Sequence, residues 1–324
     1  MQRFLRSAAL LVLTLLILSH LIDYMVTSGL RKTELPQFAV WNAILSEETS
    51  SDVIIQGSSR AWVGVSPAII SDRLDLTCYN LGVNGYSLDM QLARYRLYRE
   101  HQPAPKLVVQ VLDAYSFNMR PDLYDNNQFL PYLSEAPVRE AVEPYGYYRW
   151  YDYDLPLVRY RGKVELIWRG IAELLGIRHY VNQMDRGYLG QERKWTDEFD
   201  KFAQEHPDGY EQVWRQSMVD DLDAFLAECT GDGIMVVMVY MPEYYGARDL
   251  LNNREEIFTI FRRLSEKHDV AFLDYSFDPM AGDTEYFYNS QHLNKLGAER
   301  FSAQLAEDLA TLLQGGSPVA VRPQ

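Results

Sequence analysis

The sequence predicts a three-layer α/β fold with a mainly parallel five-stranded sheet, preceded by an apolar helix and interrupted by a large aromatic-rich insertion. Two observations predict the sheet. Short apolar runs alternate with amphipathic segments, which indicates β-α-β units. Two of the runs, KLVVQVL at 106–112 and IMVVMVY at 234–240, are apolar enough to be covered on both faces, as strands of parallel sheets are.

The first element is the apolar run SAALLVLTLLILSHLI at 7–22, which follows Arg3 and Arg6. A membrane-spanning helix needs about 17–25 residues, so residues 24–26 must contribute at the far interface. We interpret residues 1–30 as an uncleaved signal anchor, because no small-x-small cleavage site follows the run. A cleaved signal peptide and a buried helix of a soluble protein are the alternatives.

The arginines before this run favour a cytoplasmic amino end. We therefore expect a single-pass protein of the cell inner membrane whose main domain is periplasmic or otherwise extracytoplasmic. Residues 31–50 would then form a linker, residues 51–314 one α/β domain, and the Gly-, Ser- and Pro-containing residues 315–324 a disordered tail.

The elements of the domain follow in order. A buried strand at 53–56 stops at Gly57. Ser66 and Pro67 are typical of a helix start, with serine at the N-cap and proline at the first helical position. The remaining expected elements are strands at 76–81, 106–112, 234–240 and 270–274, and helices at 87–101, 255–268 and 295–313.

The insertion occupies about residues 115–232. It contains PYGYYRWYDY at 144–153 and further aromatic residues interleaved with arginines. Aromatic faces beside arginines could line a groove for a sugar or an acyl chain. The alternative is that these tyrosines serve as amphipathic packing material over the sheet.

Composition excludes several classes of protein. The formal net charge of −14 argues against a binder of nucleic-acid backbones. The two cysteines, Cys78 and Cys229, match no zinc or redox spacing and form no disulfide framework. We expect neither a metal nor a cofactor.

Three loops hold the residues that could perform chemistry. The first strand ends in Gly57-Ser58-Ser59-Arg60, the second in Asn80-Leu81-Gly82-Val83-Asn84-Gly85, and Asn289-Ser290-Gln291-His292 precedes the last helix. In open parallel sheets, ligands bind where the loops at the carboxyl ends of strands converge. A serine after a strand usually caps a helix or forms a turn, and a lone loop histidine is more often structural than catalytic, whereas the amides of the glycine-rich loop could face an oxyanion. The ordered combination is more specific than its parts.

This ordered combination resembles the SGNH (GDSL-type) hydrolase superfamily over about residues 50–114 and 232–312. The resemblance implies a flavodoxin-like three-layer fold. It places Ser59 at the nucleophile position, His292 at the general base and Gly85 as a backbone donor to the oxyanion. It is closest to membrane-anchored, exported members such as polysaccharide O-acetylation and D-alanylation proteins, which act on the cell envelope.

Two departures from the family pattern affect the expected chemistry. Strand three is followed by Asp113 without the expected asparagine, so Asn84 and Arg60 are candidates for the second oxyanion donor. The triad acid is replaced by Asn289, which carries no charge to stabilise an imidazolium. In a serine protease the equivalent change lowers turnover about ten-thousand-fold. Asp113, Asp283 or Glu285 could substitute, or a backbone carbonyl could hold the ring.

We therefore expect a serine-dependent ester hydrolase or O-acyltransferase that acts on cell-envelope glycans and contacts the membrane through its N-terminal helix. The alternatives are a weakened SGNH-like scaffold that binds glycan or partner proteins, and a purely structural domain.

Overall fold

A computed structural model describes residues 1–46 and 48–316. The chain divides into two compact units. The helical unit comprises Met1–Ser46 and Pro121–Asn182, and the sheet unit comprises Glu47–Arg120 and Gln183–Gln324. The expected disordered tail lies outside the described residues, except for Gly315 and Gly316.

The sheet unit contains one parallel five-stranded sheet, as the sequence predicts. Its order is β2-β1-β3-β4-β5, and every pair in it is parallel. This is the strand order of flavodoxin-like folds, in which the order reverses next to the first strand. The strands are β1 Val53–Gln56, β2 Cys78–Asn80, β3 Leu107–Leu112, β4 Met235–Tyr240 and β5 Ala271–Asp274.

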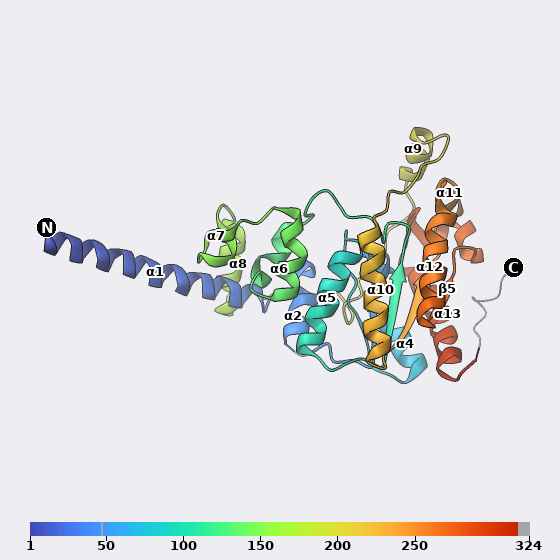
Figure 1. The fold of residues 1–324 in the computed structure, drawn as a ribbon, viewed down its shortest axis with the longest axis horizontal. Helices are drawn as coiled ribbons and strands as arrows, with labels where there is room; N and C mark the ends of the chain where they lie inside the picture. The colour runs from blue at the N-terminus through green and yellow to red at the C-terminus, as the bar shows by residue number, and fades with distance from the viewer. Residues whose placement is uncertain (47, 317–324) are drawn as a thin grey trace. The chain divides into compact units, whose positions relative to one another are not determined.

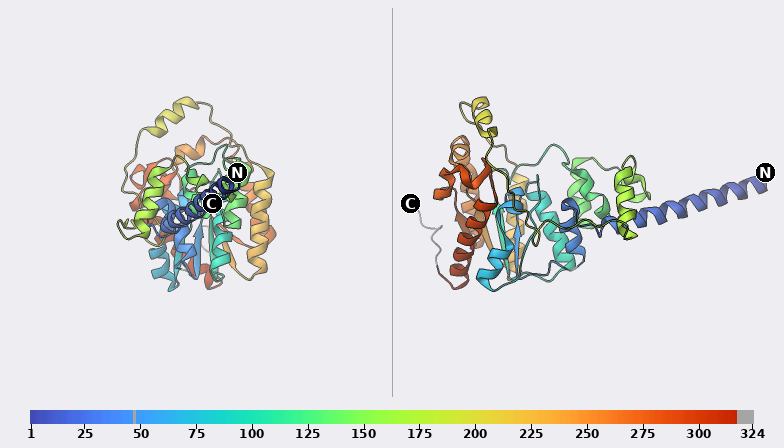
Figure 2. Two further views of the ribbon diagram at one scale, coloured as in Figure 1. Left: turned by 90° about the vertical axis from the view of Figure 1, so that its left-hand side faces the viewer. Right: turned by 180° about the vertical axis from the view of Figure 1, so that it is seen from behind.

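Helices cover both faces of the sheet. On one face lie α5 (Leu88–His101), α10 (Gln216–Gly231) and α12 (Arg254–His268), which Figure 1 shows side by side. On the other face lie α3 (Ser59–Gly64), α4 (Pro67–Leu74) and α13 (Lys295–Leu313), seen from behind in Figure 2. The sequence therefore predicts the class, the sheet and the layers correctly.

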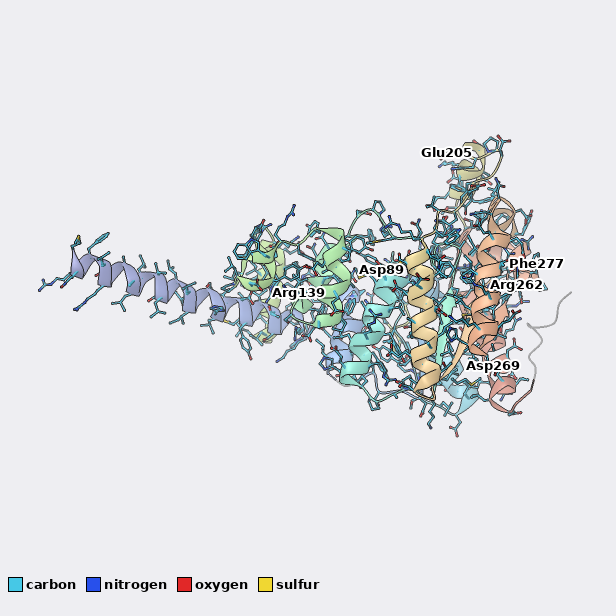
Figure 3. All side chains as sticks on the ribbon, viewed as in Figure 1. Asp89, Arg139, Glu205, Arg262, Asp269 and Phe277 are labelled. Atoms are coloured by element: carbon cyan, nitrogen blue, oxygen red, sulfur yellow. The ribbon has the colours of Figure 1, made fainter. Side chains whose placement is uncertain are left out.

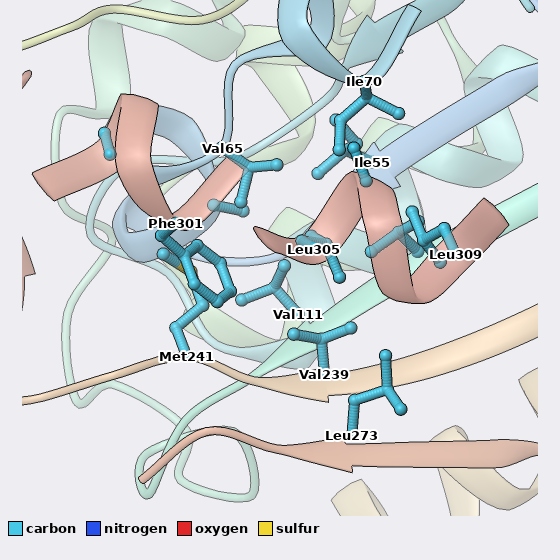
Figure 4. Close-up of a cluster of buried hydrophobic side chains, with 14 of the residues drawn as sticks. Ile55, Val65, Ile70, Val111, Val239, Met241, Leu273, Phe301, Leu305 and Leu309 are labelled. Atoms are coloured by element: carbon cyan, nitrogen blue, oxygen red, sulfur yellow. The ribbon is translucent and has the colours of Figure 1, made fainter. Parts of the chain in front are cut away.

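One hydrophobic cluster fills the space between the sheet and α13. Figure 4 shows Phe301, Leu305 and Leu309 of α13 against the strand residues Val111 and Val239. All of these side chains are fully buried. The opposite face packs through aromatic pairs: the rings of Tyr240 and Phe258 lie 4.6 Å apart, and those of Tyr95 and Phe225 lie 5.2 Å apart.

The C-terminal part of the sheet unit also holds a two-stranded hairpin, β6 (Phe287–Asn289) with β7 (His292–Leu293). It follows the short helices η4 (Pro279–Gly282) and η5 (Thr284–Tyr286) and leads directly into α13. Two smaller helices complete the unit, α9 (Glu198–Glu205) and α11 (Tyr245–Asp249).

The helical unit begins with α1 (Gln2–Leu30), which is 29 residues long and apolar enough to cross a membrane. Its most apolar 18-residue window is only 6% buried. The other elements of this unit are α2 (Pro36–Leu45), η1 (Asn126–Tyr132), α6 (Ala136–Val142), η2 (Glu143–Tyr145), α7 (Trp150–Asp154), η3 (Val158–Tyr160) and α8 (Val164–Leu174).

The domain boundaries differ from those expected. Residues 31–50, the expected linker, contain α2, whose Phe38 and Trp41 are fully buried. The segment 115–232 is not one insertion, because residues 121–182 cluster with the N-terminus and the rest with the sheet. Its last part is α10, an ordinary crossover helix between β3 and β4 that buries Leu222, Phe225 and Leu226.

Candidate active site

The expected nucleophile lies where the first strand meets a helix. β1 ends at Gln56, Ser58 is the N-cap of α3, and Ser59 is the first helical residue. The Ser58 hydroxyl oxygen accepts a hydrogen bond from the Arg60 amide, at 3.2 Å. Gly57 permits this turn, because a Cβ there would lie only 2.8 Å from the Cβ atoms of Ala61 and Val111.

The histidine lies on the hairpin. Asn289 ends β6, His292 begins β7, and the two residues face each other as an antiparallel pair. The intervening Ser290 and Gln291 form a two-residue turn. This turn is held from outside, because the Tyr244 amide donates to the Ser290 carbonyl at 2.9 Å and the Gln291 amide group donates to the Tyr115 hydroxyl at 3.1 Å.

The two loops bring serine, histidine and asparagine into line. Ser59 Oγ lies 2.7 Å from His292 Nε2, and His292 Nδ1 lies 2.9 Å from Asn289 Oδ1. The same Oδ1 accepts the backbone N–H groups of Gln291 at 3.1 Å and His292 at 3.0 Å. Because two backbone donors point at this atom, it is the amide oxygen, and the Nδ1 of His292 must donate to it.

This arrangement fixes the tautomer of the imidazole. With the proton on Nδ1, the Nε2 lone pair faces the Ser59 hydroxyl and can accept its proton. The asparagine thus selects the tautomer with the proton on Nδ1, as the aspartate of a serine–histidine–aspartate triad does. It contributes no negative charge.

The surroundings of His292 keep its ring neutral. Burial, together with the positive charges of Arg60 and Arg193, lowers the pKa of His292 to about 4. The Tyr288 ring stacks on the imidazole, with centroids 5.3 Å apart and planes 16° apart. The Arg193 guanidinium lies 4.6 Å from the Tyr288 centroid.

Two carboxylates lie on the serine side of the site. Asp113, at the end of β3, accepts a hydrogen bond from the Ser58 hydroxyl at 2.7 Å and another from the Tyr115 amide at 2.8 Å. Glu243 accepts from the Tyr240 hydroxyl at 2.8 Å and lies 4.0 Å from the Arg60 guanidinium. Burial raises the pKa of Glu243, an effect that the charge of Arg60 opposes.

Two of the candidate replacements for the triad acid, Asp113 and Asp283, form hydrogen bonds with other residues. Asp113 contacts Ser58, and Asp283 caps η5 by accepting from the Glu285 amide at 2.9 Å. The Arg60 guanidinium donates to the carbonyls of Met241 at 2.7 Å and Pro242 at 3.0 Å, so it ties the nucleophile loop to the end of β4.

The glycine-rich loop after β2 runs beside the nucleophile loop. The Val83 amide donates to the Gly57 carbonyl at 2.9 Å. The next residue, Asn84, is exposed, and Gly85 is partly buried in a turn with φ of +77°. The loop is also held from within, because Asn80 Oδ1 accepts from the Gly82 amide at 2.8 Å.

A pocket of about 610 Å³ lies beside the histidine loop. Its lining includes Arg193, Trp195, Asp283, Glu285 and Lys295. Arg193 connects the pocket to the imidazole through Tyr288, because its guanidinium lies over the ring that stacks on His292. The pocket therefore combines an aromatic ring with charges of both signs next to the candidate base.

The structure brings Ser59, His292 and Asn289 together and places Asp113 and Arg60 behind the serine. Tyr288, Arg193 and Glu243 are not among the residues that the sequence predicts for the site. Tyr288 directly precedes Asn289 and could have been singled out on that basis. Arg193 and Glu243 come from segments far apart in the chain, and no local pattern marks them.

A scan of protein-family models finds no match to this chain, and no curated protein matches it in sequence. The chain is similar to three solved structures that it matches at low identity. A Bacteroides fragilis structure described as an acylhydrolase is 11% identical, covering 80% of this chain and 87% of the other, with a TM-score of 0.37. A GDSL-like lipase from Bacteroides thetaiotaomicron is 10% identical, covering 82% and 90%, with a TM-score of 0.36.

The third is a Streptococcus pneumonia structure described as a platelet activating factor. It is 11% identical, covers 94% of this chain and 99% of the other, and has a TM-score of 0.41. At these TM-scores the function has to be inferred from the chain's own site.

Proposed function

We propose that the chain is a membrane-anchored, extracytoplasmic SGNH-type ester hydrolase or O-acyltransferase that acts on cell-envelope glycans through Ser59 and His292. The observation that carries the proposal is the line of contacts from Ser59 Oγ through the imidazole to Asn289 Oδ1, at 2.7 and 2.9 Å. A nucleophile, a base and a group that orients the base are the parts that covalent acyl transfer requires.

In the proposed reaction, His292 Nε2 takes the proton of the Ser59 hydroxyl while Oγ attacks the carbonyl carbon of an ester. The tetrahedral intermediate collapses as Nε2 returns the proton to the departing alcohol oxygen, which leaves an acyl-serine. A second hydroxyl then attacks this ester and gives its proton to Nε2, which passes it to the departing Ser59 Oγ, so that the serine hydroxyl and the neutral imidazole are restored. Water as the second hydroxyl makes the protein a hydrolase, and a sugar hydroxyl makes it a transferase.

The negative oxygen of the intermediate needs donors. We assign this role to the backbone amides of Ser59 and Gly85, with Asn84 as a further donor. The bond from the Val83 amide to the Gly57 carbonyl supports the assignment, since it holds the glycine-rich loop beside the nucleophile loop.

The pocket that contains Arg193 and Trp195 is our candidate for the site of the glycan. An aromatic ring with several hydrogen-bonding side chains suits a sugar, whose faces are partly apolar and whose edges are hydroxyl groups. Arg193 lines this pocket and also lies over the Tyr288 ring, which stacks on the imidazole, so a sugar bound here would be on the histidine side of the site.

Packing of the last third of α1 supports a retained anchor over a cleaved signal peptide. Asp23 forms an ion pair with Arg159 at 2.6 Å, and the Thr27 and Tyr160 hydroxyls lie 2.9 Å apart. Gly29 and Leu30 are buried. Cleavage beyond Thr27, at the end of α1, would remove Asp23 and Thr27 and with them these contacts to the helical unit.

Labelling with a fluorophosphonate probe tests the enzymatic part of the proposal, because only an activated serine reacts quickly with it. We expect the full chain to be labelled, Ser59→Ala to abolish labelling, and Ser46→Ala, at an exposed serine of the helical unit, to leave it unchanged. Failure of the folded wild-type protein to react would contradict an activated Ser59.

A binding scaffold is the second candidate, and one observation favours it. The imidazole has an amide behind it and two arginines lower its pKa, so the imidazolium formed during acyl transfer is poorly stabilised. Binding of an envelope glycan by a protein that the probe does not label would support the scaffold.

The membrane orientation has its own test. A reporter enzyme that works only in the cytoplasm, fused after Gln324, should be silent, whereas one that works only outside the cytoplasm should be active. The reverse pattern from a stable full-length fusion would contradict the proposed orientation.

A further inference from the structure

The two most exposed tryptophans lie in the same unit as α1. Trp150 and Trp168 are 66% and 58% exposed, whereas the other four tryptophans of the chain are buried or partly buried. Each lies on a short helix of the helical unit, α7 and α8. A tryptophan exposed to water loses the favourable free energy that burial of its large apolar surface would provide. Two such residues in one small unit therefore indicate a surface that binds a partner.

Helix α8 has an exposed apolar stripe. Val164, Trp168 and Leu175 are 75%, 58% and 57% exposed, and their spacing of four and seven residues places them on one face. Ile177 and Val181, just beyond the helix, are 62% and 85% exposed. These exposed apolar residues thus form a continuous stripe, whereas the surfaces of soluble proteins usually expose such residues singly.

The opposite side of α8 packs closely on α1. A Cβ on Gly170 would lie 2.4 Å from the Val26 carbonyl oxygen, and one on Gly29 would lie 1.7 Å from the Gly170 carbonyl oxygen. Glycines are needed at this crossing because the two backbones touch. α8 thus has a fixed position on the part of α1 that follows the apolar run.

The length of α1 places this crossing near a membrane surface. A helix of 29 residues is roughly 43 Å long, and the apolar layer of a bilayer is about 30 Å thick. The side chains along the first part of α1 stand clear of the rest of the unit (Figure 3), whereas Val26, Gly29 and Leu30 are buried. In Figures 1 and 2, α7 and α8 are the elements next to this free part of the helix.

The region is slightly basic, although Arg159, Arg161 and Arg169 are paired with carboxylates. Residues 144–182 carry six Lys or Arg and four Asp or Glu, although the chain as a whole has a net charge of −14. The Arg161 side chain is 59% exposed and its guanidinium lies 5.0 Å from the Tyr151 centroid. Basic and aromatic side chains around an apolar stripe are the composition of helices that lie in a membrane interface.

We propose that Trp150, Val164, Trp168, Leu175 and Ile177 form an interfacial surface that lies in the headgroup region of the membrane that α1 crosses. The helical unit then contacts lipid at two places, through the spanning helix and through this surface. The inference rests on the anchoring part of the proposed function and is independent of the acyl chemistry. A second contact would restrict how the helical unit tilts about α1.

The test is quenching of tryptophan emission by lipid. The full chain is reconstituted in phosphatidylcholine vesicles, with and without phosphatidylglycerol, in which the acyl chains are either brominated near the headgroup or unmodified. We expect brominated lipid to quench the wild-type emission. Trp150→Phe/Trp168→Phe should lose most of that quenching, and the matched control Trp195→Phe/Trp214→Phe, which changes the sheet unit, should keep it.

Each outcome decides the proposal. Vesicle flotation without any difference between brominated and unmodified lipid would overturn the interfacial surface and leave the anchor standing. Failure to float would overturn both. Emission that is shielded from acrylamide but insensitive to bromine would mean that a protein, such as a second copy, covers the surface, which also overturns the proposal. Phenylalanine keeps the apolar character of both exposed positions, so the double variant should fold.

Discussion

The serine side and the histidine side of the candidate site differ in how charge is arranged. Behind the serine, Asp113 accepts from the Ser58 hydroxyl, and Glu243 neighbours the buried Arg60 guanidinium. Behind the histidine, the ring donates to the neutral amide of Asn289. Carboxylates thus hold the nucleophile loop in place, whereas the group that contacts the base is neutral.

This difference separates two tasks that one aspartate performs in a triad. The amide oxygen of Asn289, fixed by two backbone N–H groups, orients the ring and selects its tautomer. Stabilisation of the imidazolium is the missing task.

The largest expected effect is on the serine side. Glu243→Gln keeps an acceptor for the Tyr240 hydroxyl but removes the negative charge next to Arg60, whose side chain is only 5% exposed. Leaving a buried charge without its partner costs about 3 kcal/mol. We expect the free energy of unfolding of the full chain in a non-ionic detergent to fall by about that amount, measured with urea.

Glu307→Gln is the matched control, since Glu307 pairs with Arg73 at 2.5 Å on the exposed surface of α13. Water screens that pair, so the unfolding transition should move little. Equal losses in both variants would mean that burial does not distinguish the two ion pairs.

The second effect is on the histidine side. Asn289→Asp adds the missing charge, raises the pKa of His292 and should increase the Ser59-dependent hydrolysis of p-nitrophenyl acetate. Loss of the aspartate costs a serine protease about ten-thousand-fold, chiefly through the wrong tautomer. Because the tautomer is already correct here, we expect a smaller gain, about tenfold to a hundredfold.

A folded Asp variant with unchanged or lower activity would show that the charge of this position does not limit the reaction. Ser59→Ala in the Asp background is the control, and it should remove the gained activity completely.

The smallest effect concerns Arg193. Its positive charge lowers the pKa of His292, so Arg193→Ala should raise that pKa, by less than about one unit because the guanidinium is exposed. Arg300→Ala is the matched control, since Arg300 lies 4.7 Å from the centroid of Tyr286, which does not stack on the imidazole. Titration of His292 by NMR distinguishes the two.

Sequence patterns predicted the sheet well and the helical unit poorly. The strands are continuous apolar runs, and the parallel arrangement follows from their alternation with helices. α10 also has a readable pattern, with Leu222, Phe225 and Leu226 on one face, but the aromatic bias of the preceding segment obscured where the insertion ends. The union of residues 1–46 and 121–182 depends on contacts such as Asp23 with Arg159, which no local pattern reveals.

The site was predictable where its residues belong to motifs. The spacing of Asn289 and His292 has a simple physical reason, because a two-residue turn places both on facing positions of a hairpin. The partners of Asp113 and the role of Asn289 Oδ1 were not predictable, since both depend on the direction of hydrogen bonds in the folded chain.

The central claim is that Ser59 is activated by a neutral imidazole whose partner is an amide. The most direct measurement is the rate of fluorophosphonate labelling of the full chain as a function of pH. A pKa of about 4 means that His292 stays unprotonated well into acid, so labelling should be constant above about pH 5 and fall as the pH drops through about 4. A midpoint near the ordinary histidine pKa of 6.5, or no labelling of the folded protein at any pH, would contradict the account.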